Sequence, residues 1–199
     1  MNKSFCYIIF NKPYGVLCQF RKVPGKQTIA DFGPFPASVH PAGRLDKDSE
    51  GLLLLTDDGM VSHFLLEPRY RHPRTYLVQV ERIPGEEKLQ KLREGTVVGR
   101  RMTLPAELRL LPEDPDIPPR STPIRFRKHV PTAWLEITLR EGRNRQVRKM
   151  TAAIGHPTLR LVRIKIGNLA LGGMQPGEKR ELRTEEIREL KNLFTDARE

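Results

Sequence analysis

Cysteine is scarce in this sequence of 199 residues, which contains only Cys6 and Cys18. The two cysteines form no CxxC pair, and no cluster of His and Cys has the spacing of a zinc site. Long apolar runs are absent too: none approaches the roughly 18 residues of a membrane-spanning helix, and the N-terminal sequence lacks the apolar segment of a secretory signal. These absences exclude a domain held together by disulfides or zinc and a membrane-spanning protein, and they predict a cytoplasmic protein.

Acidic residues are too few to balance the basic ones. The chain has 35 Lys and Arg against 24 Asp and Glu, which gives a formal net charge of +11. Such an excess favours nucleic acid as a partner, although a diffusely basic surface would give the same total. The distribution favours nucleic acid, because eight basic residues and one acidic residue give residues 140–165 a net charge of +7. The eight are Arg140, Arg143, Arg145, Arg148, Lys149, Arg160, Arg163 and Lys165.

Hydrophobic periodicity predicts strands and helices that do not alternate regularly. Strands are predicted at 5–10, 16–20, 52–55, 75–82, 102–111, 132–139 and 158–166. Helices are predicted at 59–67, 84–95, 144–154 and near the C-terminus, with Asp58, Asn144 and Thr184 as caps of the first, third and last. This pattern indicates the α+β class, with a mixed, mostly antiparallel sheet flanked by helices. We expect one domain over residues 1–199, with a division into two subdomains near the proline-rich segment 111–123.

The segment 40–59, HPAGRLDKDSEGLLLLTDDG, places a dense polar loop directly before four consecutive leucines. Residues 52–55 are too few for a free-standing helix, and the turn residues around them predict a strand buried on both faces. Such a strand would hold the loop rigidly, which makes Arg44 and Asp46 candidates for binding or catalysis. The alternative for Asp46 is that its carboxylate merely closes a turn.

The predicted helix 144–154 has a buried stripe of Val147, Met150 and Ile154 and basic side chains on its remaining surface. Basic side chains near a helix N-terminus oppose the helix dipole by about 0.3–1 kcal/mol each, and a bound anion would relieve this repulsion. Arginine can also grip a phosphate with two hydrogen bonds. The helix is therefore a candidate phosphate site; the alternative is a solvated surface helix with internal ion pairs.

A buried carboxylate needs a cationic partner to remain ionised, so Asp46 predicts an arginine from elsewhere in the chain. We expect this partner to be Arg148. Arg145 lies one helical turn away, so that one of the two arginines can face phosphate while the other faces the cleft.

Four separated segments carry motifs that can be compared with known families. They are NKPYGVLCQF at 11–20, HPAGRLDKDSEGLLLLTDDG at 40–59, RTYLVQV at 74–80 and LREGRNRQVRKMTAAIGHPTLRLVRIKIG at 139–167. Over most of its length the chain resembles the RsuA/RluE group of ribosomal RNA pseudouridine synthases. The resemblance implies the pseudouridine synthase fold with a central catalytic cleft. It also implies isomerisation of uridine in RNA to pseudouridine, in which the C1′–N1 bond breaks and a C1′–C5 bond forms without a cofactor or a metal.

The resemblance also implies roles for single residues. Asp46 matches the essential aspartate of the family, acting either as a nucleophile or as a base that abstracts a sugar proton, with Arg148 as its ion-pair partner. Tyr76 matches the tyrosine that stacks on the uracil, whereas alternation along strand 75–82 alone favours a core tyrosine. Asp46, Tyr76 and Arg148 are the predicted catalytic set. The expected RNA contacts are Arg44, Lys12, Arg143, Arg145, Lys149, Arg160 and Arg163.

Many members of the wider family begin with a small S4-type RNA-binding domain, for which we find no room before segment 11–20. We therefore expect the catalytic domain itself to bind RNA, as a monomer, with 23S ribosomal RNA of the large subunit as substrate. Two alternatives belong to other classes. A non-catalytic RNA-binding or ribosome-assembly protein would need neither Asp46 nor Tyr76. A glycoside or nucleoside hydrolase would usually want a second carboxylate, such as Asp48 or Glu50.

Overall fold

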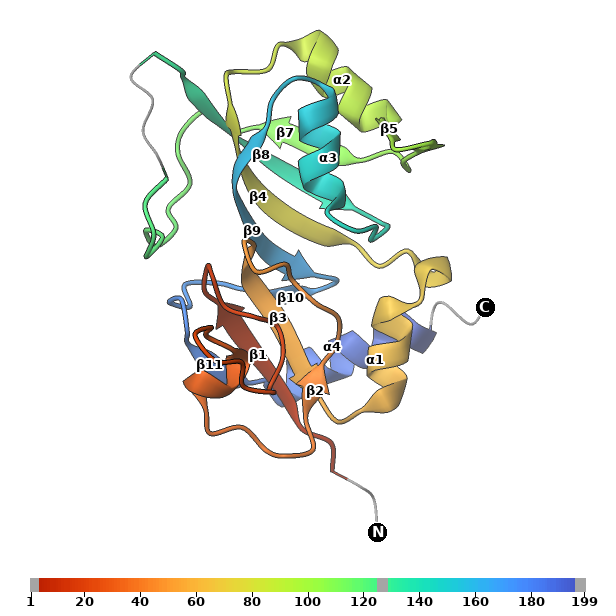
Figure 1. Cartoon of the computed structure of the whole chain (residues 1–199). Helices are drawn as coiled ribbons and strands as arrows, with labels where there is room; N and C mark the ends of the chain where they lie inside the picture. The colour runs from red at the N-terminus through yellow and green to blue at the C-terminus, as the bar shows by residue number, and fades with distance from the viewer. Residues whose placement is uncertain (1–3, 125–128, 196–199) are drawn as a thin grey trace.

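The central sheet is built from strands that lie far apart in the sequence (Figure 1). The computed structural model describes residues 4–124 and 129–195. The strand order of the sheet is β11 (Lys179–Glu181), β1 (Tyr7–Lys12), β3 (Glu50–Thr56), β9 (Thr158–Ile166), β4 (Arg74–Glu81), β8 (Thr132–Leu139) and β7 (Glu107–Leu110). The short strands β2 (His40–Pro41) and β10 (Leu169–Ala170) pair with β3 and β9, and β5 (Val97–Val98) forms a separate hairpin with β6 (Arg101–Met102).

The sheet is mixed but mostly antiparallel. Of the pairs between named strands, only β3 and β9 run parallel, where Glu50 pairs with Val162 and Gly51 with Arg163. The helices are α1 (Gly59–Leu66), α2 (Glu86–Glu94), α3 (Gln146–Ala153) and α4 (Thr184–Thr195), with short 3-10 helices at Ile29–Phe32 and Pro68–Tyr70. The predicted α+β class with a mostly antiparallel sheet is confirmed. Within the residues described, no helix is long and apolar enough to cross a membrane.

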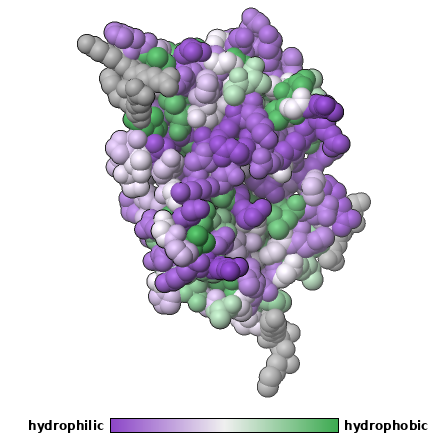
Figure 2. Space-filling model, viewed as in Figure 1, coloured by the Kyte–Doolittle hydropathy of each residue, from purple (hydrophilic) through white to green (hydrophobic). Residues whose placement is uncertain are grey.

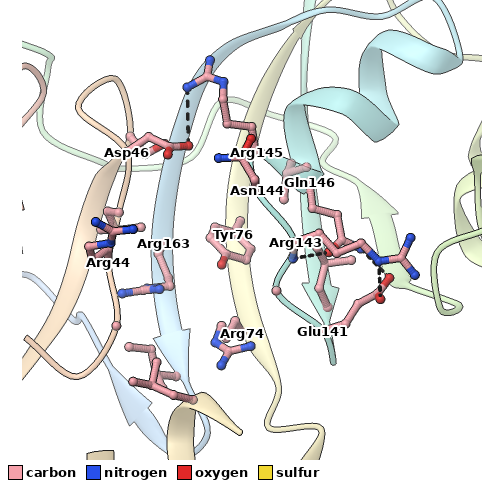
Figure 3. Close-up of a pocket in the computed structure, with 18 of the residues that line it drawn as sticks. Arg44, Asp46, Arg74, Tyr76, Glu141, Arg143, Asn144, Arg145, Gln146 and Arg163 are labelled. Carbon is pink, nitrogen blue, oxygen red and sulfur yellow. Dashed lines mark hydrogen bonds and ion pairs between the residues drawn. The ribbon is translucent and has the colours of Figure 1, made fainter. Parts of the chain in front are cut away.

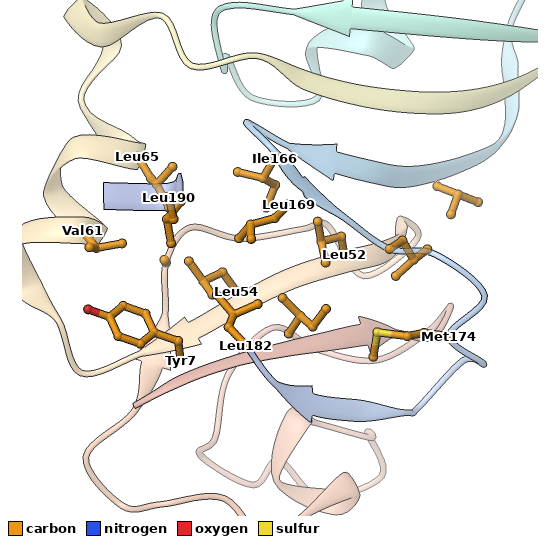
Figure 4. Close-up of a cluster of buried hydrophobic side chains, with 14 of the residues drawn as sticks. Tyr7, Leu52, Leu54, Val61, Leu65, Ile166, Leu169, Met174, Leu182 and Leu190 are labelled. Carbon is orange, nitrogen blue, oxygen red and sulfur yellow. The ribbon is translucent and has the colours of Figure 1, made fainter. Parts of the chain in front are cut away.

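The four leucines of β3 occupy both faces of the sheet, and all four are fully buried. Leu52 and Leu54 belong to a core cluster with residues of α1 and α4 (Figure 4). Leu53 and Leu55 belong to a second cluster on the other side, with Ile8 and Phe10 of β1 as members. Burying a leucine stabilises a fold by about 1.5–3 kcal/mol, so β3 is a firm base for the polar loop before it. The strand predicted to be buried on both faces is confirmed.

A glycine is required where β3 meets β9. Gly51 has a φ of +104°, and a Cβ on it would lie 2.3 Å from the carbonyl oxygen of Arg163. A side chain at this position would force the two backbones apart, and the positive φ adds strain for any residue that has a Cβ. Gly51 therefore allows the two halves of the sheet to join immediately beside the polar loop.

The second half of the fold packs α2 and α3 against β4 and β8. Its core cluster contains Val78 and Val80 of β4 and Leu135 and Ile137 of β8. The helices contribute the buried side chains Leu89, Leu92, Val147 and Met150, and Ile154, directly after α3, is also buried in this cluster. The apolar stripe predicted on helix 144–154 is thus confirmed, and it leaves the basic side chains of α3 on the other face of the helix.

Two predicted strands differ in the structure. Residues 16–20 form only an isolated bridge, Leu17 with Thr28, because β1 already has β11 on one side and β3 on the other. The strand predicted at 102–111 is divided into β6 and β7 around Pro105. Proline has no N–H to give to a strand ladder, and the neighbouring Leu104 N–H donates instead to the Glu141 carboxylate at 2.8 Å.

The predicted helix starts were right for α1 and displaced for the others. The Asp58 side chain caps α1 by accepting from the N–H groups of Met60 and Val61. The residue before α3 is Arg145, not Asn144, and its φ of 51° places it in the left-handed region. Thr184 is the first residue of α4 and not its cap. The Arg183 N–H donates to the Glu186 carboxylate there.

The proline-rich segment 111–123 contains no helix or strand and connects β7 to β8, which pair with each other. Leu111 and Ile117 pack against the first core cluster, and the Pro118 carbonyl accepts a hydrogen bond of 2.8 Å from Arg160. The segment is therefore held against the molecule at several points. The subdomain division predicted here stays a prediction.

Candidate active site

The polar loop before β3, residues 42–49, is fixed at both ends and in its middle; we call it the Asp46 loop. The Ala42 N–H donates to Leu54 O at 2.8 Å, and the Ser49 N–H donates to Asp46 O at 3.0 Å. The Gly15 N–H, from the turn after β1, donates to Lys47 O at 2.8 Å. Three backbone hydrogen bonds thus set the direction in which the Asp46 side chain leaves the loop.

The Asp46 loop forms one wall of a cavity of about 400 Å³. The other walls come from β4, β9, the end of α1 and the turn 140–146 that leads into α3 (Figure 3). Hydrophilic residues gather in a broad band across the middle of this face of the molecule (Figure 2). Six arginines line the cavity together with Asp46 and Tyr76, and they are Arg44, Arg74, Arg140, Arg143, Arg145 and Arg163.

Tyr76 and Arg163 are paired residues of two adjacent strands, β4 and β9. Tyr76 is half-buried, because its ring packs against the second-half core and also faces the cavity. Arg163 is only 4% exposed, and its Nε donates to Leu52 O at 2.8 Å. Its Nη2 has no hydrogen-bond partner within the described residues. A buried guanidinium nitrogen without a partner favours an acceptor oxygen entering the cavity.

Asp46 is paired with an arginine, but only weakly. Its Oδ2 lies 3.4 Å from Arg145 Nη1, and its side chain is 35% exposed. Arg145 makes its two short hydrogen bonds to Asp48 instead, both at 2.8 Å. These bonds lower the pKa of the Asp48 carboxyl and raise the pKa of the Arg145 guanidinium. Arg148 also contacts Asp48, through Nε at 3.4 Å and through a hydrogen bond from Nη2 to the backbone oxygen at 2.6 Å.

Comparison with known proteins shows the family of this chain. The family model for RNA pseudouridylate synthases matches residues 6–153. The chain belongs to the RNA pseudouridylate synthase family. It is 55% identical, over 85% of its length and 90% of the relative, to a ribosomal large subunit pseudouridine synthase E of Xanthomonas axonopodis pv. citri. It is 51% identical to the protein of that name from Vibrio parahaemolyticus, over 88% of the chain and 73% of the relative.

A solved structure of a pseudouridylate synthase has the same fold. It superposes with a TM-score of 0.78 at 33% identity, over 94% of this chain and 74% of that one. The prediction of a pseudouridine synthase fold and activity is therefore confirmed at the level of the family. Within the described residues, no group of three or more His, Cys, Asp or Glu side chains could hold a metal ion.

Most of the predicted site residues of this pseudouridine synthase line one cavity, although their roles stay predictions. They are Arg44, Asp46, Tyr76, Arg143, Arg145 and Arg163. Asp46 of the loop before β3 and Tyr76 of β4 both line the cavity (Figure 3). Arg143 is held by the Glu141 carboxylate and by the backbone oxygens of the β5–β6 hairpin. Lys149 is exposed outside the cavity, where its ammonium donates to Asn144.

The predicted pairing of Arg148 with Asp46 is wrong. Arg148 binds Asp48, and the arginine beside Asp46 is Arg145. Because α3 starts at Gln146, Arg145 lies before the helix in the left-handed conformation and not on the helical face assumed for it. Burial in the second half of the fold lowers the pKa of Arg148, which is only 13% exposed.

Two predicted RNA contacts are buried and engaged elsewhere. Lys12 is fully buried, and its Nζ donates to Pro13 O and Val16 O, so it holds the turn after β1. Arg160 is 8% exposed and forms two hydrogen bonds, of 3.0 and 2.8 Å, to the buried Glu50 carboxylate. In these positions neither side chain can reach an RNA backbone. Net charge along residues 140–165 did not distinguish the internal Arg160 from the surface cations of that segment.

The sequence analysis missed Arg74 and Gln146 as site residues. Arg74 lies two positions before Tyr76 on β4, so its side chain shares the face of the strand that lines the cavity. Its Nη2 donates to Leu65 O at 2.6 Å, which ties the cavity to α1. Gln146 donates to Glu141 and accepts from the Arg143 N–H, which fixes the turn before α3. The two-residue periodicity of a strand would have identified Arg74 as a site residue from the position of Tyr76. No local sequence pattern marks Gln146 as one.

Lys12 is expected to make stability depend on pH. Burial lowers the pKa of its ammonium group to about 8 from its ordinary value of 10.5. Between these values the unfolded chain holds a proton that the folded chain has released, so stability rises with pH by at most about 1.4 kcal/mol per unit. Urea unfolding at about pH 7.5 and about pH 9.5 should show a smaller rise for Lys12→Met than for the wild type. An identical rise in both proteins would contradict this assignment.

Proposed function

We propose that this protein isomerises a uridine of large-subunit ribosomal RNA to pseudouridine, with Asp46 as the catalytic carboxylate. One observation carries the proposal: Asp46, Tyr76 and six arginines line a single cavity of about 400 Å³. That volume lies in the range of pockets that enclose small ligands, and a single nucleoside belongs to this class. A cavity lined by six arginines against the three carboxylates of Asp46, Glu67 and Glu141 suits a substrate that carries phosphate.

The positions of Tyr76, Asp46 and the arginines in the cavity support separate roles for them in the reaction. A uridine within a stem must be flipped out at a cost of a few kcal/mol, and stacking on Tyr76 together with phosphate contacts would offset that cost. Asp46 then acts either as a nucleophile or as a base at the sugar, and the C1′–N1 bond breaks. After the uracil turns, the C1′–C5 bond forms as Asp46 leaves the sugar in the nucleophile route or returns the sugar proton in the base route. The C5 proton leaves to water while N1 takes up a proton. No atom is gained or lost overall, so the product is an isomer of the substrate.

The large-subunit substrate is supported by the names of relatives. Two proteins named ribosomal large subunit pseudouridine synthase E are 55% and 51% identical to this chain over most of its length. Exposed Arg44 and half-exposed Arg145 are then the first candidates for phosphate contacts from the two sides of the cavity. Such contacts set the position of the RNA but do not by themselves select a uridine.

The two carboxylates considered for the hydrolase alternative, Asp48 and Glu50, are both engaged by arginines. Asp48 accepts both short hydrogen bonds of Arg145, and Glu50 is 4% exposed and bonded to Arg160. A general acid or base must be able to exchange protons with the substrate, which these two engaged carboxylates are poorly placed to do. The alternative of a non-catalytic RNA-binding protein predicts binding without turnover.

The test is release of tritium from transcripts labelled at uracil C5. Large-subunit rRNA, small-subunit rRNA and large-subunit particles assembled with labelled rRNA are each incubated with the protein. We expect release from large-subunit substrates only, and mass-based mapping should then show one new pseudouridine. Binding without release from any substrate would support the non-catalytic alternative, and free uracil among the products would support a hydrolase.

A further inference from the structure

The Arg145 guanidinium divides its contacts unequally between two carboxylates. Nη1 and Nη2 each donate to one oxygen of Asp48 at 2.8 Å, whereas the contact with Asp46 is longer, with Nη1 3.4 Å from Oδ2. Figure 3 shows this single contact between Arg145 and Asp46 at the edge of the cavity. The planar fork of arginine matches one carboxylate at a time. Asp48 therefore takes up the bidentate pairing with Arg145 that would otherwise be open to Asp46.

Asp48 is itself held in place. Its carboxylate lies 3.4 Å from Arg148 Nε, and its backbone oxygen accepts from Arg148 Nη2 at 2.6 Å. Arg145 is fixed at its other end by a left-handed backbone, with a φ of 51°, directly before α3. A residue with a long side chain adopts the left-handed conformation only at an energetic cost. This backbone conformation therefore sets the direction in which the Arg145 side chain leaves the chain.

The consequence for Asp46 follows from charge and geometry. A carboxylate that is paired bidentately with arginine has both oxygens occupied and a lower basicity, so it is a weaker nucleophile and a weaker base. A carboxylate beside a cation that is engaged elsewhere keeps its oxygens free. Loss of the Asp48 charge would let the Arg145 fork turn to Asp46, because Asp46 already lies at the edge of its reach.

We propose that Asp48 is a positioning residue, which holds the Arg145 guanidinium beside Asp46 and prevents the two from pairing tightly. The inference rests on the proposed function, since it concerns the reactivity of Asp46 toward RNA. It assigns Asp48 no contact with the substrate. Its effect on the reaction passes entirely through Arg145, and this distinguishes it from a residue that only supports the fold.

A double-mutant cycle tests the proposal. Asp48→Asn, Arg145→Ala and the double variant are compared with wild type for single-turnover tritium release at saturating RNA and for RNA affinity. We expect Asp48→Asn to slow the single-turnover rate on the order of tenfold while RNA affinity is unchanged or higher, because the variant gains one positive charge. In the Arg145→Ala background, the same substitution should cause no further loss. Asp48→Glu, which restores the carboxylate, should recover part of the rate.

Other outcomes overturn the proposal. A rate loss of equal size in both backgrounds would show that Asp48 acts without Arg145, and an unchanged rate in Asp48→Asn would show that it does not act at all. If the wild type releases no tritium from any rRNA, the proposed function fails first. A crystal structure of Asp48→Asn still decides the inference in that case, since Arg145 should have turned to within about 3 Å of both Asp46 oxygens. An Arg145 that stays on residue 48 would contradict it.

Discussion

Replacement of Asp46 by asparagine is expected to reduce tritium release from large-subunit rRNA by about 10⁴-fold or more. The amide has nearly the same shape as the carboxylate and can still accept a hydrogen bond from Arg145. It has no negative charge, so it can act neither as the nucleophile nor as the base at the sugar. RNA affinity, measured by fluorescence anisotropy, should be unchanged or higher, because a negative charge is removed from a cavity that faces phosphates.

The matched control is the same substitution at an exposed carboxylate. Asp114 is exposed in the segment between β7 and β8 and is not among the residues that line the cavity. Asp114→Asn should keep both the rate and the affinity of the wild type. An Asp46→Asn protein that keeps more than about a tenth of the wild-type rate would rule out Asp46 as the essential group.

Replacement of Arg160 by alanine is expected to destabilise the protein by about 3–5 kcal/mol, because the Glu50 carboxylate would be left buried without its cation. Both partners are almost inaccessible: Arg160 is 8% exposed and Glu50 is 4% exposed. The substitution also removes the hydrogen bond from Arg160 to Pro118 O. Urea unfolding at neutral pH measures the loss. The double variant Glu50→Leu with Arg160→Met should lose less stability than the single variant, since no buried charge remains.

A surface pair provides the comparison for this prediction. Arg109 donates to Glu136 at 3.0 Å with 68% of its side chain exposed, so Arg109→Ala should change stability by no more than about 1 kcal/mol. If Arg160→Ala is equally mild and weakens RNA binding instead, Arg160 is the RNA contact that its sequence position suggests. The two measurements thus separate an internal ion pair from a phosphate contact.

The parts of the site that follow from local patterns could be predicted from the sequence. The four consecutive leucines of β3 and the regularly spaced apolar side chains of α3 each indicate burial from a short stretch of sequence. Both predictions were correct. The alternation of β4 favoured a core position for Tyr76, and the structure gives its ring both core contacts and a face in the cavity. Family motifs marked Asp46 and Tyr76, and the fold places both in one cavity.

The ion pairs could not be predicted, because each depends on a contact over a long stretch of sequence. Arg145 meets Asp48 across 97 residues, and Arg160 meets Glu50 across 110. The choice between Arg145 and Arg148 depended on where α3 starts. A shift of one residue in the helix cap, from Asn144 to Arg145, decides whether the Arg145 side chain follows the helical spacing at all, and such boundaries are the least certain part of a sequence-based prediction.

The order of strands in the sheet also has a consequence for how the protein folds. The Asp46 loop precedes β3, but the strand that completes its surroundings, β9, follows about 110 residues later, and β1 pairs with β11 near the end of the described chain. Contacts of such long sequence separation close slowly, because the entropy of ordering the intervening chain is lost before they form. During synthesis β9 becomes available to β3 only after most of the chain has been made, and the Asp46 carboxylate can meet Arg145 only late in folding.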